Sequence, residues 1–214
     1  MCGRYRRTTA EEGLARRYHI PIPAQLDLPI SWNLAPSQDV LAIRFNPKTK
    51  QRSLDPLRWG LIPYWAKDPK IAYKTINARA ESVDTAPSYQ QAFKTRRCLI
   101  PADSFYEWKK VVGGKIPYAI GKKDDSPFVF AGLWEGWKEP STGEWLGTCT
   151  IITGEPNELV AQIHYAHASH IAGRRSRKMA GRSPGRRFEG VAEALSSRPD
   201  ADLGNQSKSE FTGE

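Results

Sequence analysis

The chain has 214 residues, 39% of them hydrophobic, and a formal net charge of +9, which is typical of one folded, basic domain. It has no apolar run of about 18 residues, so we expect no membrane-spanning helix, and its arginine-rich start lacks the apolar stretch of a secretory signal. Three cysteines are too few for a disulfide framework and favour a reducing compartment such as the cytoplasm. The basic excess suits a polyanion such as nucleic acid, although it also fits a basic protein without such a partner.

Short β-strands dominate the first 164 residues, because runs rich in β-branched and aromatic residues alternate there with Gly, Pro, Asp and Ser. We predict strands over 2–6, 39–45, 57–62, 97–102, 105–111, 116–121, 128–134 and 147–153. Helices are predicted over 9–18, where Thr9 and Glu12 form a capping-box pattern, and over 88–94 and 158–163. This order is not a βαβ repeat. It predicts a single α+β domain built on a curled, barrel-like, mostly antiparallel sheet with a few short helices.

The composition changes after His164. All seven tryptophans precede residue 146, and the stretch GRRSRKMAGRSPGRR is basic and glycine-rich, with no helix or strand period. Such a composition cannot bury enough apolar surface to offset the entropy of ordering. We therefore predict a folded body over 2–164 and a poorly ordered tail over 165–214.

Cys2 follows the initiator methionine in the opening MCGRY. Methionine before a small residue is usually removed, which would leave Cys2 with a free α-amine beside its thiol. With ordinary pKa values of about 7.7–8.0 and 8.5, both groups have a usable deprotonated fraction near neutral pH. Such a pair condenses with an aldehyde to an imine and closes to a five-membered thiazolidine, and Gly3 leaves room for a ligand. The alternative is a terminal cysteine with no role.

Asn77 and Arg79 lie two residues apart in INARAES, so they face the same side of an extended chain. An amide beside a guanidinium suits a sugar hydroxyl or an amine next to a phosphate. The alternative is a solvated loop.

Glu107 shares a strand face with Phe105 in SFYEW. A carboxylate on an apolar face needs partners and suits proton transfer. The alternative is an outward-facing side chain that pairs with Lys109.

His164 ends NELVAQIH and carries the side chain best matched to proton transfer at neutral pH. The alternative is a histidine favoured by the dipole of a helix C-terminus. His164, His167 and His170 recur every third residue, as in a metal cluster, but the segment after His164 looks foreign to the fold. We predict no metal and no cofactor.

Aromatic residues and cations alternate in RWGLIPYWAKD, which contains Arg58, Trp59, Tyr64, Trp65 and Lys67. That composition suits nucleobases stacked on rings beside phosphates. The alternative is core aromatics with ordinary surface charges.

Taken together, MCGRY, WNLAPSQ, RWGLIPYWAKD, INARAES, RCLIPADSFYEW and IITGEPNELVAQIH resemble the SOS-response-associated peptidase (SRAP) family over residues 2–164. The resemblance implies a monomer that binds single-stranded DNA carrying an abasic site. It also implies a stable thiazolidine crosslink to the sugar aldehyde that shields the lesion in the DNA damage response, and a self-processing peptidase activity. A cytoplasmic, nucleoid-associated protein would fit this role in a bacterium.

The resemblance also implies roles for individual residues. Cys2 is the nucleophile, Asn77 holds the α-amine and the sugar, and Glu107 orients the amine and moves protons. His164 assists sugar ring opening and reversal of the crosslink. The implied DNA contacts are Arg4 and Arg79 at phosphates, Trp65 at the flanking bases, and Tyr64 and Lys67 beside it.

The sequence departs from the family in two places. Ser104 stands where glycine is usual, and HYAHASHIAGR replaces the usual apolar ending after His164. We interpret the second departure as a reading-frame change that replaced the end of the domain and exposes apolar surface. Two other functions stay open: an N-terminal-nucleophile amidohydrolase, since such enzymes often begin Met-Cys-Gly, and a noncatalytic reader of modified or damaged DNA.

Overall fold

The computed structural model describes residues 2–21, 26–155, 160 and 211–213. The helical segments are α1 (Glu11–Tyr18), the 3-10 helix η1 (Pro69–Lys74) and α2 (Gln90–Thr95). The strands are β1 (Tyr5–Arg7), β2 (Ser31–Leu34), β3 (Asp39–Asn46), β4 (Gln51–Trp59), β5 (Asn77–Arg79), β6 (Arg97–Ala102), β7 (Ser104–Val111), β8 (Gly114–Lys122), β9 (Phe128–Lys138), β10 (Trp145–Thr153) and β11 (Phe211–Gly213). Among these residues, no helix is long and apolar enough to cross a membrane.

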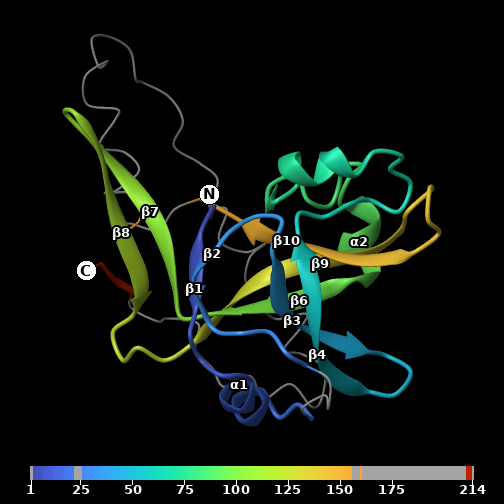
Figure 1. Cartoon of the computed structure of the whole chain (residues 1–214), viewed down its shortest axis with the longest axis horizontal. Helices are drawn as coiled ribbons and strands as arrows, with labels where there is room; N and C mark the ends of the chain where they lie inside the picture. The colour runs from blue at the N-terminus through green and yellow to red at the C-terminus, as the bar shows by residue number, and fades with distance from the viewer. Residues whose placement is uncertain (1, 22–25, 156–159, 161–210, 214) are drawn as a thin grey trace, which may run out of the picture.

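Five strands close into a barrel in the order β4-β3-β6-β9-β10, because β10 also pairs with β4 (Figure 1). The β10–β4 pairing is parallel and the other four are antiparallel. β5 extends the sheet by pairing in parallel with β10, with Asn77 opposite Ile151. The predicted α+β fold on a curled, mostly antiparallel sheet is confirmed.

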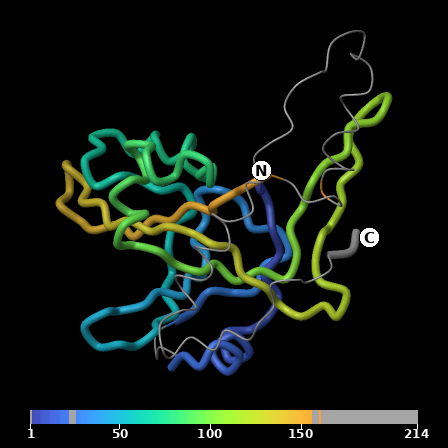
Figure 2. The backbone as a smooth tube through the Cα atoms, turned by 180° about the vertical axis from the view of Figure 1, so that it is seen from behind, coloured from blue at the N-terminus to red at the C-terminus, as the bar shows by residue number. Residues whose placement is uncertain are grey.

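A second sheet, in the order β11-β8-β7-β1-β2, stands beside the barrel (Figures 1 and 2). Its long β7–β8 hairpin extends away from the barrel, whereas β1 and β2 lie against it. Neighbouring strands of this sheet run antiparallel. Because successive side chains of a strand point to opposite faces, residues on one face of β7 recur at every second position.

The two sheets share one hydrophobic core. Tyr5 and Leu34 of the second sheet pack with Trp59, Ile100 and Cys149 of the barrel. The Tyr5 ring meets Trp59 edge-on at a centroid distance of 5.4 Å, a geometry that adds about 0.5–1.5 kcal/mol beyond simple burial. This packing fixes the start of the chain between the two sheets.

The strand predicted over 57–62 instead ends at Trp59. Gly60 has a φ of 129°, which side chains rarely adopt, and its N–H donates to the Cys149 carbonyl at 2.8 Å. An added Cβ there would lie 2.8 Å from the Ala72 carbonyl oxygen. The strands β2 and β5 were not predicted, because three or four residues show no clear alternation.

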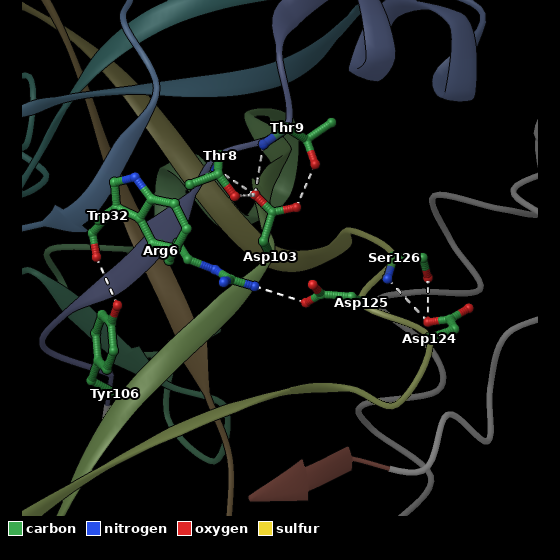
Figure 3. A network of polar contacts seen from close by, with 9 residues as sticks. All are labelled: Arg6, Thr8, Thr9, Trp32, Asp103, Tyr106, Asp124, Asp125 and Ser126. Atoms are coloured by element: carbon green, nitrogen blue, oxygen red, sulfur yellow. Dashed lines mark hydrogen bonds and ion pairs between the residues drawn. The ribbon is translucent and has the colours of Figure 1, made fainter. Parts of the chain in front are cut away.

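The capping box predicted at Thr9 is wrong. Helix α1 begins at Glu11, and its N-cap Ala10 has no side-chain hydrogen bond. Thr9 instead donates its backbone N–H to Asp103 Oδ2 at 2.9 Å, and its hydroxyl also binds the Asp103 carboxylate (Figure 3). A distant acid therefore anchors the chain before α1. The predicted 88–94 helix appears as α2, and the 158–163 helix falls almost wholly outside the described residues.

Candidate active site

Cys2 lies buried between the two sheets, with 5% of its surface exposed. Its Sγ donates to the Arg4 carbonyl oxygen at 3.7 Å. Burial, reinforced by the negative charge of Glu107, raises the pKa of the Cys2 thiol to about 12. The usable thiolate fraction expected for an exposed chain end is therefore not present in this buried position, where the thiol stays protonated near neutral pH.

Asn77 fixes the backbone of Cys2. Its Nδ2 donates to the Cys2 carbonyl oxygen at 2.7 Å. The Tyr89 hydroxyl in turn donates to the Asn77 carbonyl oxygen at 3.0 Å, and β5 is held by β10. Asn77 Oδ1 is buried and has no hydrogen-bond partner among the described residues, so an acceptor is left for an N–H or O–H donor.

Glu107 reaches the same place from β7. It is 6% exposed, and its charge acts on the Cys2 thiol. Its burial agrees with the predicted inward orientation and not with an outward pairing to Lys109. The structure thus brings Cys2, Asn77 and Glu107 together from the chain start, β5 and β7.

Two arginines flank this centre. Arg4 follows Cys2 by two residues and donates from Nη1 to Asn33 Oδ1 at 3.1 Å. Arg79 is exposed at the end of β5, two residues beyond Asn77, with buried Ala78 between them facing the opposite side. Both cations belong to segments that contribute a residue to this centre, and each carries a group that can bind an anion.

The loop after β4 presents exposed rings. Ala66 is its buried anchor and accepts a hydrogen bond from Trp137 Nε1 at 2.7 Å. Tyr64 and Trp65 are 59% and 49% exposed, and Lys67 is exposed as well. This anchoring holds an apolar and basic surface open to solvent.

Trp59 does not belong to that surface. It is 1% exposed, and its Nε1 donates to the Ile76 carbonyl oxygen at 2.8 Å. It closes the core at the end of β4, so the core alternative considered for the aromatic stretch is correct for this ring.

His164, His167 and His170 lie outside the described residues. Within the described ranges, no group of three or more His, Cys, Asp or Glu side chains is arranged to hold a metal ion.

Two supporting residues were missed by the sequence analysis. Tyr89 holds the backbone of Asn77, and Asn33 holds Arg4. Both contacts join segments distant in sequence, so no local pattern could have signalled them. Asn33 does lie within WNLAPSQ, one of the stretches that carries the resemblance.

A buried cysteine near the chain start lies beside an asparagine amide and a buried carboxylate, and exposed cations and rings stand on the surrounding segments. This combination is a candidate site for cysteine chemistry on an anionic ligand. The chain belongs to the SOS response associated peptidase (SRAP) family, whose model matches residues 1–178.

The chain is also similar to named proteins. The abasic site processing protein YoqW of Bacillus subtilis is 48% identical over 167 residues, which cover 77% of this chain and 73% of the relative. The abasic site processing protein HMCES of Gallus gallus is 37% identical over 139 residues, covering 55% of this chain and 41% of the relative. A crystal structure of a protein from Bacteroides thetaiotaomicron matches with a TM-score of 0.70 at 27% identity, covering 78% of this chain and 74% of that one.

Proposed function

We propose that this chain processes abasic sites by binding single-stranded DNA and forming a thiazolidine crosslink through Cys2, which shields the lesion. The convergence of Cys2, Asn77 and Glu107 carries the proposal. The names of the relatives, abasic site processing proteins, support the substrate class.

The proposed chemistry needs no redox partner. Once Met1 is removed, the α-amine of Cys2 adds to the aldehyde of the open sugar and water leaves, giving an imine. The sulfur then adds to the imine carbon, forming the C–S bond, and the thiol proton ends on the ring nitrogen. The net change is the loss of one water.

Glu107 supplies the base that this step requires. The buried thiol, with a pKa of about 12, must lose its proton as the C–S bond forms, and the Glu107 carboxylate is close enough for its charge to act on the sulfur. The same carboxylate would accept a proton from the α-amine as it adds to the aldehyde and return it to the hydroxyl that leaves as water.

Asn77 orients the nucleophile. Its Nδ2 holds the Cys2 carbonyl, and its unpartnered Oδ1 would accept an N–H of the α-amine. With both polar atoms of its side chain bound to Cys2, Asn77 would hold the α-amine in a reactive orientation. His164 is proposed to assist sugar ring opening and reversal of the crosslink.

Arg4 and Arg79 would bind phosphates of the DNA strand, and Trp65 would contact its bases, with Tyr64 and Lys67 beside Trp65. A single strand suits these contacts, because its bases stack on exposed rings without first being unpaired.

Denaturing gels test the proposal. The protein is incubated with a single-stranded oligonucleotide carrying one abasic site and heated before electrophoresis. We expect a heat-stable adduct that is lost in Cys2→Ala and kept in the control Cys98→Ala. With borohydride, Cys2→Ala should again be trapped as a reduced imine, because its terminal amine remains. A heat-stable adduct that forms equally well in Cys2→Ala without reductant would refute the mechanism.

A further inference from the structure

The solvent-facing side of the second sheet carries two exposed tryptophans outside the site described above. Trp32 on β2 is 63% exposed and Trp108 on β7 is 41% exposed. Single exposed rings are common on protein surfaces, so the contacts of Trp32 decide whether it is a binding feature.

Trp32 is held in place. The Arg6 guanidinium lies 5.2 Å from the centroid of the indole, and Arg6 Nη2 is itself fixed by Asp125 Oδ1 at 2.8 Å (Figure 3). The Trp32 carbonyl oxygen accepts the Tyr106 hydroxyl at 2.7 Å. An indole with one cation stacked on it and most of its surface exposed is an ordered platform for another flat ring.

The platform is continuous with the surroundings of Cys2. Trp32 is followed by Asn33, which accepts a hydrogen bond from Arg4. The Arg4 carbonyl oxygen accepts both the Cys2 thiol and the backbone N–H of Tyr106. A chain of direct contacts therefore joins the nucleophile, the proposed phosphate contact and the Trp32 ring.

We propose that Trp32, backed by Arg6, stacks a nucleobase of the DNA strand on one side of the lesion. This inference rests on the proposed function, which places the lesion at Cys2 and a phosphate at Arg4. A nucleobase fits better than a protein side chain because the chain carries a net charge of +9 and a guanidinium already lies against the ring. Base stacking on an aromatic ring tolerates any sequence, as a lesion-directed protein requires.

The test compares Trp32→Ala with Trp32→Tyr and with Trp145→Ala. Trp145 is a matched exposed tryptophan, 72% exposed, at the opposite end of β10 from Ile151, which pairs with Asn77. Trp32→Ala keeps the backbone carbonyl that binds Tyr106, so the variant is expected to fold, and a thermal melt checks this. We expect binding of an intact fluorescein-labelled oligothymidine to weaken about tenfold in Trp32→Ala. Trp32→Tyr should restore most of it, and Trp145→Ala should bind as the wild type does.

A second measurement locates the stacked base. One oligonucleotide carries the abasic site near its 5′ end and the other near its 3′ end. Most flanking nucleotides therefore lie on the 3′ side of the lesion in the first and on the 5′ side in the second. Trp32→Ala should slow adduct formation with one of them and leave the other unchanged.

The outcomes separate this inference from the proposed function. A wild-type adduct with binding and rates unchanged by Trp32→Ala would overturn the stacking role and leave the crosslinking proposal standing. Equal losses in Trp32→Ala and Trp145→Ala would overturn it too, because they would indicate nonspecific contact. If the wild type forms no adduct and Trp32→Ala still weakens binding, stacking stands and the proposed chemistry fails.

Discussion

Cys2 differs from the other two cysteines in its neighbours rather than in its burial. All three are buried, and burial raises the pKa of Cys98 to about 12, as it does for Cys2. All three belong to one hydrophobic core cluster, but the Cys2 carbonyl oxygen also accepts a hydrogen bond from Asn77, and the Cys2 thiol lies within the field of Glu107. Its proposed reactivity therefore depends on converging polar groups and an adjacent amine, not on an acidified thiol.

Glu107→Gln should make the Cys2 thiol more acidic and yet slow its reaction with abasic DNA. Removing the negative charge lowers the pKa of the Cys2 thiol, so the pH profile of its alkylation by iodoacetamide should shift to lower pH. Adduct formation with abasic DNA should nevertheless slow, about 100-fold or more, because the proton acceptor is lost. Glu107→Gln with an unshifted alkylation profile and a wild-type crosslinking rate would contradict both roles.

Asn77→Ala should affect chemistry more than stability. The lost hydrogen bond to Cys2 is worth about 1 kcal/mol in urea unfolding, whereas misplacing the nucleophile should slow the crosslink on the order of 10- to 100-fold. Asn46→Ala is the control, since the Asn46 side chain also hydrogen-bonds to the backbone: its Oδ1 accepts the N–H of Lys48 at the distant end of β3. The orienting role fails if the two variants crosslink equally fast.

At the scale of elements, most of the long strands were predictable, whereas the short β2 and β5 were not. β4 is an exception among the long strands, because it begins at Gln51 and the predicted strand over 57–62 covers only its last residues. Residues of β6, β7 and β10 alternate or form apolar runs long enough to be recognised, and alternation placed Glu107 on the same face as Phe105. Alternation left open whether that face points inward, and the burial of Glu107 answers this. The role of β5 in holding Asn77 depends on β10 and Tyr89, which only the tertiary structure supplies. The start of α1 was mispredicted for the same reason, because Asp103 captures Thr9.

Two glycines of β9 differ in the space around them, so replacing each by alanine should have different effects on the free energy of unfolding. A Cβ at Gly132 would lie 2.9 Å from the Thr150 carbonyl oxygen and 3.1 Å from Cys98 Sγ, whereas one at Gly136 would lie 3.7 Å from Trp145. Gly132→Ala should therefore cost about 1–3 kcal/mol of unfolding free energy, measured with urea, through overpacking. Gly136→Ala on the same strand should be nearly neutral. Equal stability of the two variants would contradict the described packing.

For the whole molecule, the net charge of +9 predicts that the affinity for single-stranded DNA falls as the salt concentration rises. If Arg4, Lys67 and Arg79 each contact one phosphate, the logarithm of the affinity for intact single-stranded DNA should fall against log salt with a slope of about −2. Arg79→Ala should make the slope shallower by about 0.7, and Lys48→Ala, in the β3–β4 turn, should leave it unchanged. An unchanged slope in Arg79→Ala would remove that residue from the DNA contact.

The organisation of the chain beyond the barrel stays a prediction. The composition after His164 and the departure from the usual family ending indicate an altered tail, yet the family model extends to residue 178. The predicted boundary at 164 and the predicted role of His164 fall within residues 161–210, outside the described residues.

The central claim is that one covalent centre, the Cys2 amine and thiol, captures an abasic sugar. Intact mass spectrometry of the wild-type protein incubated with single-stranded abasic DNA tests it most directly. We predict an adduct equal to the protein lacking Met1 plus the oligonucleotide minus one water, with fragmentation placing the DNA on Cys2. An adduct placed on a lysine, or no adduct from a protein that has lost Met1 and binds the strand, would contradict the account.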